Sequence, residues 1–332
     1  MVKRYLIDSI RQLNEFFMDG VEAGTLTQIY GPFQAGKSLL ILQILYEWVS
    51  KGFGNALILD TEFSIMNNFS RRWLSRFSKR FGREVSFKQL TLKKYVVQGG
   101  RRRYLNDITN VVIEVLTELD IQVDRPFIRR LLDHLIPNHE LIPEDGGEGL
   151  GYIYILDVKG LTHLYELMGL ESKVVDEDTK LDVVVRYRTD LYTSPLARFI
   201  EKYRVRFLSL DSLGGLVKSL TSLNRIQNFP ARASALNILL HNLSKLANEY
   251  GLIVFVSNHE TKSPINNFQT FYGGSSVGYG FKYTLYIKRI KDLRRELIGY
   301  RTPHLPENRF RVLLNIDEGG FHEVSSDSGE NH

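Results

Sequence analysis

The chain of 332 residues contains no cysteine. This absence excludes disulfide bonds, zinc sites built from thiolates and catalytic thiols, and it is typical of proteins in a reducing compartment. The sequence also lacks any apolar run near the roughly 20 residues that a membrane-spanning helix needs. We therefore expect a cytoplasmic protein without a membrane segment.

Neither sign of charge is in large excess. The 43 Lys and Arg residues against 38 Asp and Glu residues leave a net charge of +5, so the positions of the charges say more than their sum. The first residues lack the long apolar core and the small-residue cleavage site of a signal peptide. Segment 324–332 is of low complexity and cannot bury enough apolar area to offset ordering, so we predict a disordered tail.

Short aliphatic segments alternate with longer helical patterns. We predict buried strands at 26–30, 56–59, 183–185, 207–210 and 252–256, and helices at 38–50 and 231–250. This alternation predicts an α/β fold with a mainly parallel central sheet covered on both faces. The end of the chain differs, because segments 283–289 and 309–316, with a Gly319–Gly320 turn, predict antiparallel strands.

One long segment does not follow this alternation. Residues 90–180 contain a helical pattern at 107–119, then Pro126 and Pro137, and then a glycine-rich loop from Pro143 to Gly149. A connection of this length is too long for a structureless loop, so we predict an inserted subdomain of unknown role. The core would then consist of residues 1–89 and 181–323.

Residues 31–38 match the phosphate-loop pattern G-x-x-x-x-G-K-[ST] completely, between a predicted strand and an apolar helix. Glycines allow such a loop to turn its backbone N–H groups toward phosphate oxygens, and the helix N-terminus favours negative charge. The lysine would neutralise the phosphates, and the serine hydroxyl would bind Mg²⁺. The predicted nucleotide-binding residues are Gly31, Pro32, Phe33, Gln34, Ala35, Gly36, Lys37 and Ser38.

Two acidic residues at predicted strand ends complete this site. Asp211 closes an apolar strand, so we expect it to hold Mg²⁺ together with Ser38. Hydrolysis also needs a group that orients water, and Glu62 lies at the tip of the segment 57–62, three residues after the strand at 56–59. The sequence therefore predicts a site for ATP and Mg²⁺ with Glu62 as the catalytic carboxylate.

These motifs together resemble the RecA/RadA recombinase family, in particular archaeal-type RadA paralogues. The blocks that carry the resemblance are 13–31, Asp60-Thr61-Glu62, Ser257-Asn258-His259, and Pro303-His304-Leu305-Pro306-Glu307 with Phe310. The resemblance implies a RecA-type P-loop NTPase core, ATP hydrolysis and a role in recombination and repair. It assigns the catalytic base to Glu62, phosphate binding to Lys37, and sensing of the γ-phosphate to Asn258 and His259.

The sequence departs from the family pattern at several positions. Leu39 stands where the family has Gln, Phe69 falls near its adenine-stacking Arg, and His259 replaces the Gln that senses the γ-phosphate. We still expect Leu39 and Phe69 to contact the nucleotide. The family's N-terminal helix-hairpin-helix domain has no counterpart before the core, so the resemblance implies an accessory ATPase that assists a full-length RadA-type recombinase or another paralogue.

Basic residues concentrate in one stretch. Between Arg71 and Arg103 there are twelve basic residues and one acidic residue, and Arg101, Arg102 and Arg103 follow a Gly-Gly turn. Such density favours binding of a phosphate backbone without sequence preference. The alternative is a solvated surface balanced by acidic residues on another element.

The resemblance separately places two DNA-binding loops, after Asp211 and after His259. Aromatic side chains on such loops stack unpaired bases, so single-stranded DNA is the expected partner. The alternative is that these aromatic side chains pack against a neighbouring subunit in a homo-oligomer. The resemblance also implies that an adjoining subunit completes the ATP site, with Lys288 and Arg289 as the candidate contacts. The predicted DNA-binding residues of these loops are Arg225, Lys262, Phe268, Phe271 and Tyr272.

Two other classes of function remain open from the sequence. A nucleotide-gated interaction protein would bind ATP with little turnover and dock on a partner. A RecA-fold signalling ATPase or autokinase would work without DNA, and the large insertion would then dock a partner.

Overall fold

The computed structural model describes residues 3–65, 68–119, 121–122, 124–135, 138–146, 149–177, 180–218, 229–262 and 269–324. The chain forms two compact units, Met1–Lys88 with Gly147–His332, and Gln89–Gly146. Within the described residues, no helix combines the length and the apolar character needed to cross a bilayer. The predicted tail lies outside the described residues from 325 onward.

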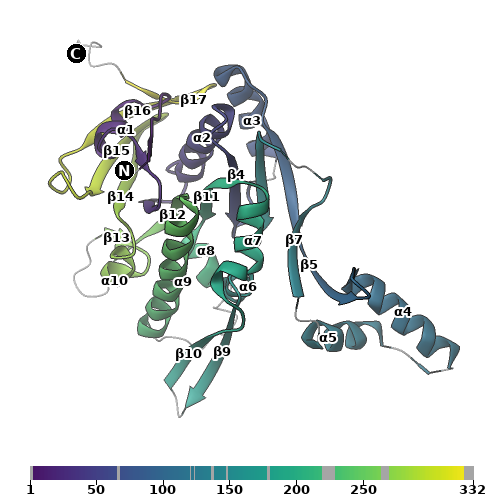
Figure 1. Ribbon diagram of the computed structural model, residues 1–332. Helices are drawn as coiled ribbons and strands as arrows, with labels where there is room; N and C mark the ends of the chain where they lie inside the picture. The colour runs from purple at the N-terminus through teal and green to yellow at the C-terminus, as the bar shows by residue number, and fades with distance from the viewer. Residues whose placement is uncertain are drawn as a thin grey trace, which may run out of the picture. The chain divides into compact units, whose positions relative to one another are not determined.

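The first unit contains a mixed central sheet with the strand order β17-β16-β15-β14-β3-β12-β11-β4-β8 (Figure 1). In this order, each pair of neighbouring strands from β14 through β3, β12, β11 and β4 to β8 is parallel. Each pair of neighbours from β17 to β14 is antiparallel. The parallel strands are β3 (Thr25–Gly31), β4 (Asn55–Asp60), β8 (Tyr152–Asp157), β11 (Val205–Asp211), β12 (Ile253–Lys262) and β14 (Tyr283–Lys291). The antiparallel end consists of β15 (Arg294–Arg301), β16 (Arg311–Asp317) and β17 (Gly320–Glu323). The predicted fold class is confirmed.

Helices cover both faces of this sheet because successive side chains of a buried strand point to opposite faces. Ile58, Phe207 and Phe255 belong to the core that contains α2, whereas Leu57 and Leu208 are buried on the other face. The helix α9 packs on β3 and β12, and α7 packs on β11. The helices of this unit are α1 (Gln12–Phe16), α2 (Lys37–Ser50), α3 (Asn68–Phe81), α6 (Leu161–Leu167), α7 (Pro195–Lys202), α8 (Leu213–Lys218), α9 (Phe229–Tyr250) and α10 (Gly274–Gly278), with the 3₁₀ turn η1 (Leu191–Thr193).

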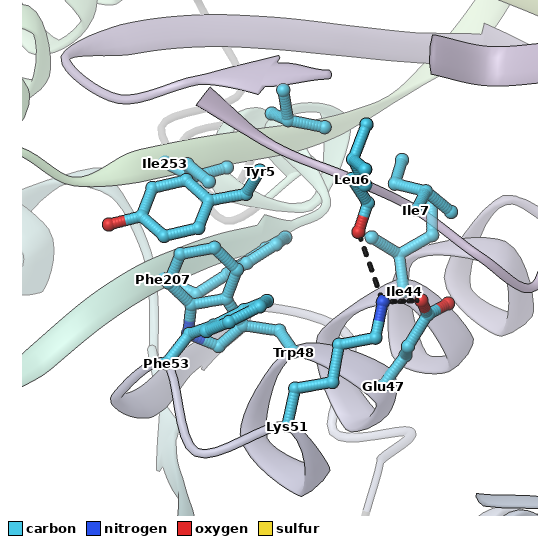
Figure 2. A pocket seen from close by; sticks show the side chains of 11 residues that line it. Tyr5, Leu6, Ile7, Ile44, Glu47, Trp48, Lys51, Phe53, Phe207 and Ile253 are labelled. Carbon is cyan, nitrogen blue, oxygen red and sulfur yellow. Dashed lines mark hydrogen bonds and ion pairs between the residues drawn. The ribbon is translucent and has the colours of Figure 1, made fainter. Parts of the chain in front are cut away.

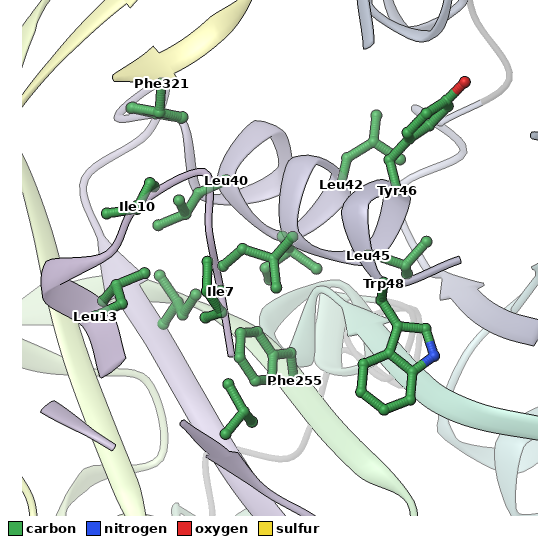
Figure 3. Close-up of a cluster of buried hydrophobic side chains, with 14 of the residues drawn as sticks. Ile7, Ile10, Leu13, Leu40, Leu42, Leu45, Tyr46, Trp48, Phe255 and Phe321 are labelled. Atoms are coloured by element: carbon green, nitrogen blue, oxygen red, sulfur yellow. The ribbon is translucent and has the colours of Figure 1, made fainter. Parts of the chain in front are cut away.

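The helix α2 is buried on nearly all sides, which explains its apolar sequence from Leu39 to Val49. Figure 3 shows side chains of α2 between Phe255 of the sheet, Phe321 of β17 and apolar residues of the N-terminal segment. That segment contains β1 (Arg4–Tyr5) and β2 (Val21–Glu22), which pair antiparallel. This packing fixes the start of α2, where the phosphate loop ends.

Aromatic side chains and one lysine attach the N-terminal segment to the C-terminal end of α2 (Figure 2). The ring centroids of Tyr5 and Trp48 lie 4.3 Å apart. Lys51 donates to the backbone oxygen of Leu6 at 3.1 Å and forms an ion pair with Glu47. The segment before the phosphate loop is therefore part of the core.

The second unit, Gln89–Gly146, is a small α+β element. Its strands β6 (Arg101–Tyr104) and β7 (Asn138–Pro143) both pair antiparallel with β5 (Ser86–Gln98), and its helices are α4 (Leu105–Glu118) and α5 (Arg125–Leu135). Gly99 and Gly100 form the β5–β6 turn with φ of +56° and +74°, a backbone conformation that favours glycine.

The structure differs from the expected insertion at its C-terminal limit. The predicted segment was 90–180, but residues from 147 onward belong to the first unit. The reason is β8, which pairs in parallel with β4 so that Asp157 lies opposite Asp60. The run Tyr152–Asp157 is an apolar strand ending in Asp, a pattern like that of β11, and it extends the central sheet.

The predicted strand at 183–185 also lies elsewhere than expected. It belongs to β10 (Lys180–Tyr187), which pairs antiparallel with β9 (Leu170–Glu177) in a separate two-stranded sheet. A short apolar run does not reveal its pairing partner, which only the tertiary structure provides. The short β13 (Gln269–Phe271) pairs antiparallel with the end of β12.

Candidate nucleotide-binding site

The phosphate loop joins β3 to α2 at the carboxyl edge of the parallel strands. Two of its glycines are required by close packing. A Cβ at Gly31 would lie 2.1 Å from the backbone oxygen of Ile287, and a Cβ at Gly36, where φ is +103°, would lie 2.8 Å from the ring of Phe321. Neither position accepts a side chain without displacement of β14 or β17. The sequence pattern and the packing of the loop therefore agree.

The antiparallel strands also hold the loop and the helix behind it. Arg295 of β15 donates from Nε to the backbone oxygen of Ala35 at 2.9 Å. The buried side chain of Gln43 exchanges two hydrogen bonds with the backbone of Phe321, at 3.0 and 2.7 Å. The loop is thus enclosed by elements that are far away in the sequence.

Lys37 is the first residue of α2 and is almost fully buried. Its Nζ donates to the backbone oxygens of Gly31 and Pro32 at 3.1 and 2.9 Å, so the ammonium lies within the curve of the loop. Burial lowers the pKa of Lys37, while the nearby carboxylates of Asp211 and Glu62 act in the opposite direction. The structure brings Lys37, Asp211 and Glu62 together as the sequence predicts.

Asp211 ends β11 and is also buried. It accepts hydrogen bonds from the hydroxyl groups of Ser257 and Ser38. Burial raises the pKa of Asp211, and these two hydrogen bonds partly counteract that effect. The predicted metal ligands Ser38 and Asp211 therefore lie in direct contact and present only oxygen atoms, which is the donor type that Mg²⁺ prefers.

The loop that carries Glu62 is organised by Asp60. The Asp60 carboxylate accepts the backbone N–H groups of Glu62 at 3.0 Å and of Ser64 and Ile65 at 2.8 Å each. Asp60 is fully buried, and burial raises its pKa. Three N–H donors toward one carboxylate fix the turn after β4. The Asp of the Asp-Thr-Glu motif thus has a structural role, and Glu62 projects from the turn that it holds.

Glu62 lies in a hydrogen-bonded cluster with His259 and Ser212. Its Oε1 accepts from the Ser212 hydroxyl at 2.8 Å and lies 2.7 Å from His259 Nε2. Ser212 Oγ lies 3.2 Å from the same imidazole nitrogen and accepts the backbone N–H of Gly215 at 3.1 Å. The Glu62 side chain is 28% exposed, so the cluster opens to solvent. The predicted base and the predicted γ-phosphate sensor are therefore direct partners.

Close packing holds this cluster from the side of α8. A Cβ at Gly214 would lie 2.5 Å from His259 Cδ2, and one at Gly215 would lie 2.1 Å from Thr61 Oγ1. Thr61 Oγ1 donates to the backbone oxygen of Ser212 at 2.8 Å. The ends of β4, β11 and β12 are thereby joined at one edge of the sheet.

Asn258 connects the cluster to β13. This residue is fully buried, donates from Nδ2 to the backbone oxygen of Tyr272 at 2.9 Å, and accepts the N–H of His259 at 2.8 Å. The N–H of Tyr272 donates to the backbone oxygen of His259 at 2.9 Å. His259 and Asn258 are therefore linked by backbone and side-chain hydrogen bonds to Tyr272, directly after β13.

The structure does not present Phe271 to a DNA base as predicted. Its ring is 5% exposed, and its centroid lies 5.3 Å from that of Tyr30. A Cβ at Gly278 would lie 2.5 Å from the ring, so the ring is enclosed on that side as well. Its position shortly before Gly273-Gly274 led to the prediction that it stacks on a base, but here it completes an aromatic cluster with Tyr30 and Tyr300.

The other residues predicted to contact nucleotide, DNA or a neighbouring subunit lie in different environments. Leu39 packs partly buried against the hydrophobic core, and Phe33 is 74% exposed at the loop. Arg225 and Phe268 lie outside the described residues, and the side chains of Phe69 and Lys262 are not among those described. Lys288, a predicted contact to an adjoining subunit, forms an ion pair with Glu296 at 2.6 Å, and Arg289 is exposed.

The basic stretch divides into residues with structural partners and exposed residues. Arg80 donates to the backbone oxygens of Gly319 and Phe321, and Arg102 pairs with Glu140. Arg101 and Arg103 are exposed on β6. Part of the charge density that the sequence shows is therefore used to hold the fold.

Sequence reasoning missed Ser212 and Arg295. Ser212 follows Asp211 directly, and the convergence of polar residues at the carboxyl ends of parallel strands could have indicated it. Arg295 is one of two adjacent arginines in a strand. No local signal distinguishes the buried arginine from its exposed neighbour Arg294.

A phosphate loop after β3, acidic residues at or just after the ends of β4 and β11, and the antiparallel C-terminal strands together define a RecA-type P-loop NTPase fold. No protein-family model matches the chain. The crystal structure of the RadB recombinase matches it with a TM-score of 0.54 and 16% sequence identity, covering 97% of this chain and 100% of that chain. The likeness establishes the common fold.

The sequence comparisons lead to the same proteins. Over 61 residues the chain is 39% identical to the DNA repair and recombination protein RadB of Methanococcoides burtonii, covering 18% of this chain and 27% of the relative. Over 57 residues it is 40% identical to RadB of Methanosphaera stadtmanae, covering 17% and 24%. The chain thus spans about a quarter of the length of the curated relatives that it matches. The predicted resemblance to RecA/RadA-family recombinase paralogues is confirmed.

Proposed function

We propose that the protein is an ATPase of homologous recombination and DNA repair that binds DNA and assists a full-length RadA-type recombinase. The observation that carries this proposal is the complete phosphate loop beside the Glu62–His259–Ser212 cluster. The curated relatives are named as DNA repair and recombination proteins, which supports the biological role.

The residues of the site fit ATP with Mg²⁺. Lys37 and the N–H groups of the loop would hold the phosphates, and Ser38 and Asp211 would hold the metal ion. The buried Asp211 carboxylate, bonded to the Ser38 hydroxyl, is the kind of oxygen pair that magnesium sites use. Bound Mg²⁺ supplies charge neutralisation at the phosphates.

The Glu62 carboxylate orients the attacking water and accepts its proton in this proposal. Its hydrogen bond from Ser212 fixes one carboxylate oxygen, and its partial exposure leaves access for water. His259, in contact with Glu62, would sense the terminal phosphate and transmit its presence through Asn258 to Tyr272.

Single-stranded DNA is the proposed nucleic-acid partner. The exposed Arg101 and Arg103 supply two cations to a phosphate backbone. A homo-oligomer or a complex with a RadA-type recombinase would complete the ATPase site from a neighbouring subunit, as the family resemblance implies.

The test is ATP turnover with and without single-stranded DNA, on the wild type, Lys37→Ala and the exposed control Lys245→Ala. We expect turnover that DNA stimulates, a loss of at least about a hundredfold in Lys37→Ala, and no change in Lys245→Ala. A wild type that binds ATP without measurable turnover would instead favour the nucleotide-gated interaction protein. Phosphate transferred to a Ser or Thr of the chain would favour the autokinase.

DNA binding is tested separately by titration at several salt concentrations. Replacement of Arg101 and Arg103 by Ala should weaken binding for all sequences and lower the slope of log affinity against log salt by about 2. The matched control carries Arg309→Ala, an exposed arginine of the other unit. Equal affinity of the wild type for DNA and for a neutral polymer at low salt would contradict the proposal.

A further inference from the structure

Arg295 places a guanidinium group directly behind the phosphate loop. The residue is 6% exposed, although its neighbour Arg294 on the same strand is exposed. Its Nε donates to the backbone oxygen of Ala35, and its Nη1 donates to the backbone oxygens of Asp292 at 2.8 Å and Arg294 at 3.0 Å. All three acceptors are neutral carbonyl groups.

Among the described residues, the charge of Arg295 is not balanced by a carboxylate. Within the described part of the chain Arg295 forms no ion pair, and the charged neighbour that acts on it is a second cation, Arg289. Burial and Arg289 both lower the pKa of Arg295. The adjacent Glu296 is already engaged by Lys288 at 2.6 Å and Arg311 at 3.1 Å. Buried cations in proteins are normally paired with an anion, so an anion is expected close to Arg295.

The hydrogen bond from Arg295 to the backbone oxygen of Ala35 also sets the direction of the next backbone N–H group, that of Gly36. In a planar trans peptide the C=O and the following N–H point in opposite directions. Because Arg295 holds the oxygen of Ala35, the N–H of Gly36 points away from Arg295. Gly36 precedes Lys37, the first residue of α2, so this N–H belongs to the group of donors at the helix start that favours phosphate.

We propose that Arg295 is a positioning residue for the nucleotide polyphosphate, which fixes the Ala35–Gly36 peptide and supplies a cation that the phosphates balance. This inference rests on the proposed function, because it requires the loop to bind a nucleotide. A cation that acts through space on the phosphates favours the more highly charged nucleotide. Arg295 should therefore contribute more to the binding of ATP than to that of ADP.

The experiment measures dissociation constants of ATP and ADP by calorimetry for the wild type, Arg295→Met, Arg295→Lys and Arg294→Met. Arg294 is the matched control, since it lies next to Arg295 on β15 but is exposed. We expect Arg295→Met to weaken ATP binding at least about tenfold and ADP binding by a smaller factor. Arg295→Lys keeps the charge without the planar fork, so it should restore the preference for ATP over ADP with a lower overall affinity. Arg294→Met should bind both nucleotides as the wild type does.

Thermal unfolding of the nucleotide-free proteins separates positioning from a purely structural role. If ATP and ADP lose the same factor in Arg295→Met, or if ATP affinity is unchanged, the inference is overturned. If Arg295→Met does not fold, the ATP-to-ADP ratio in Arg295→Lys decides, and a ratio below that of Arg294→Met overturns it. A wild type that binds neither nucleotide would instead refute the proposed function.

Discussion

The two sides of the nucleotide site are held by different kinds of contact. The phosphate loop is fixed by backbone approaches that leave no room for a Cβ, at Gly31 against Ile287 and at Gly36 against Phe321. The opposite side also has close approaches, at Gly214 and Gly215, but there the Glu62 and His259 side chains, 28% and 20% exposed, are held by hydrogen bonds.

This difference indicates on which side of the site a residue can be substituted without disturbing the fold. A substitution in the loop displaces strands of the central sheet, so its cost falls on the whole fold. A substitution in the Glu62 cluster changes a hydrogen bond at the edge of the sheet and leaves the core in place. The replacement of the family's Gln by His259 occurs on this second side.

The largest expected effect is on turnover. Glu62→Gln removes the proton acceptor, so ATP hydrolysis should fall by about 10²–10⁴-fold, while ATP affinity and the unfolding midpoint remain close to the wild type. Steady-state turnover and calorimetric ATP binding measure the two quantities. Glu84→Gln, at an exposed position of the same unit, is the control. Unaltered turnover in Glu62→Gln would show that another group is the base.

The next effect concerns the loop itself. In Gly31→Ala the new Cβ would meet the backbone oxygen of Ile287, so β14 must shift, and we expect a loss of about 3 kcal/mol or more in the free energy of unfolding. Urea unfolding measures it.

The control for this steric effect is Gly82→Ala. Gly82 has φ of +66° with nothing within 4 Å of its Cβ position, so the substitution should cost only the backbone strain of about 1–2 kcal/mol. If both variants lose the same stability, the close approach at Gly31 does not limit the fold.

A smaller effect is expected at Ser212. Ser212→Ala removes the hydroxyl that donates to Glu62 Oε1, while that oxygen keeps its contact with His259 Nε2. A lost hydrogen bond to a charged group is worth about 1.5–3 kcal/mol, so turnover should fall at least about tenfold. Ser209→Ala, on β11 just before Ser212, is the control, because the buried Ser209 hydroxyl has no partner among the described residues. Equal turnover in the two variants would remove Ser212 from the site.

The smallest expected effect is on the pH dependence of stability, through Glu296 of β15. Burial alone would raise the pKa of Glu296, but Lys288 and Arg311 outweigh it and hold the pKa below the ordinary 4.5. A lowered carboxyl pKa adds stability that is present above 4.5 and is lost as pH falls through the folded-state value.

The wild type should therefore exceed Glu296→Gln in stability at neutral pH by no more than about 1 kcal/mol, and the difference should vanish in acid. Chemical unfolding at a series of pH values measures this difference. If the stability difference between the wild type and Glu296→Gln grew as the pH falls, the assigned direction of the Glu296 pKa shift would be wrong.

Several elements of the fold and site were predictable because their signals are local. The phosphate loop, the strand before it, the helix after it, and Asp211 and Glu62 near strand ends were all found from pattern and spacing, and the structure brings Lys37, Asp211 and Glu62 together. The strand at 152–157 and the pairing of 183–185 were not, since a short apolar run does not specify its neighbours. Phe271 was misjudged for the same reason, because its burial depends on Tyr30 and Gly278.

The sequence by itself determined the chemical groups of this protein: a loop that can surround phosphate, a carboxylate and a hydroxyl suited to Mg²⁺, and a glutamate after a strand. The tertiary structure alone decided which groups touch. It set His259 and Ser212 on Glu62, enclosed Phe271, and covered Arg295 while Arg294 stayed exposed. The physical reason is that residue type and periodicity act over a few positions, whereas contacts between distant strands arise only when the whole sheet forms.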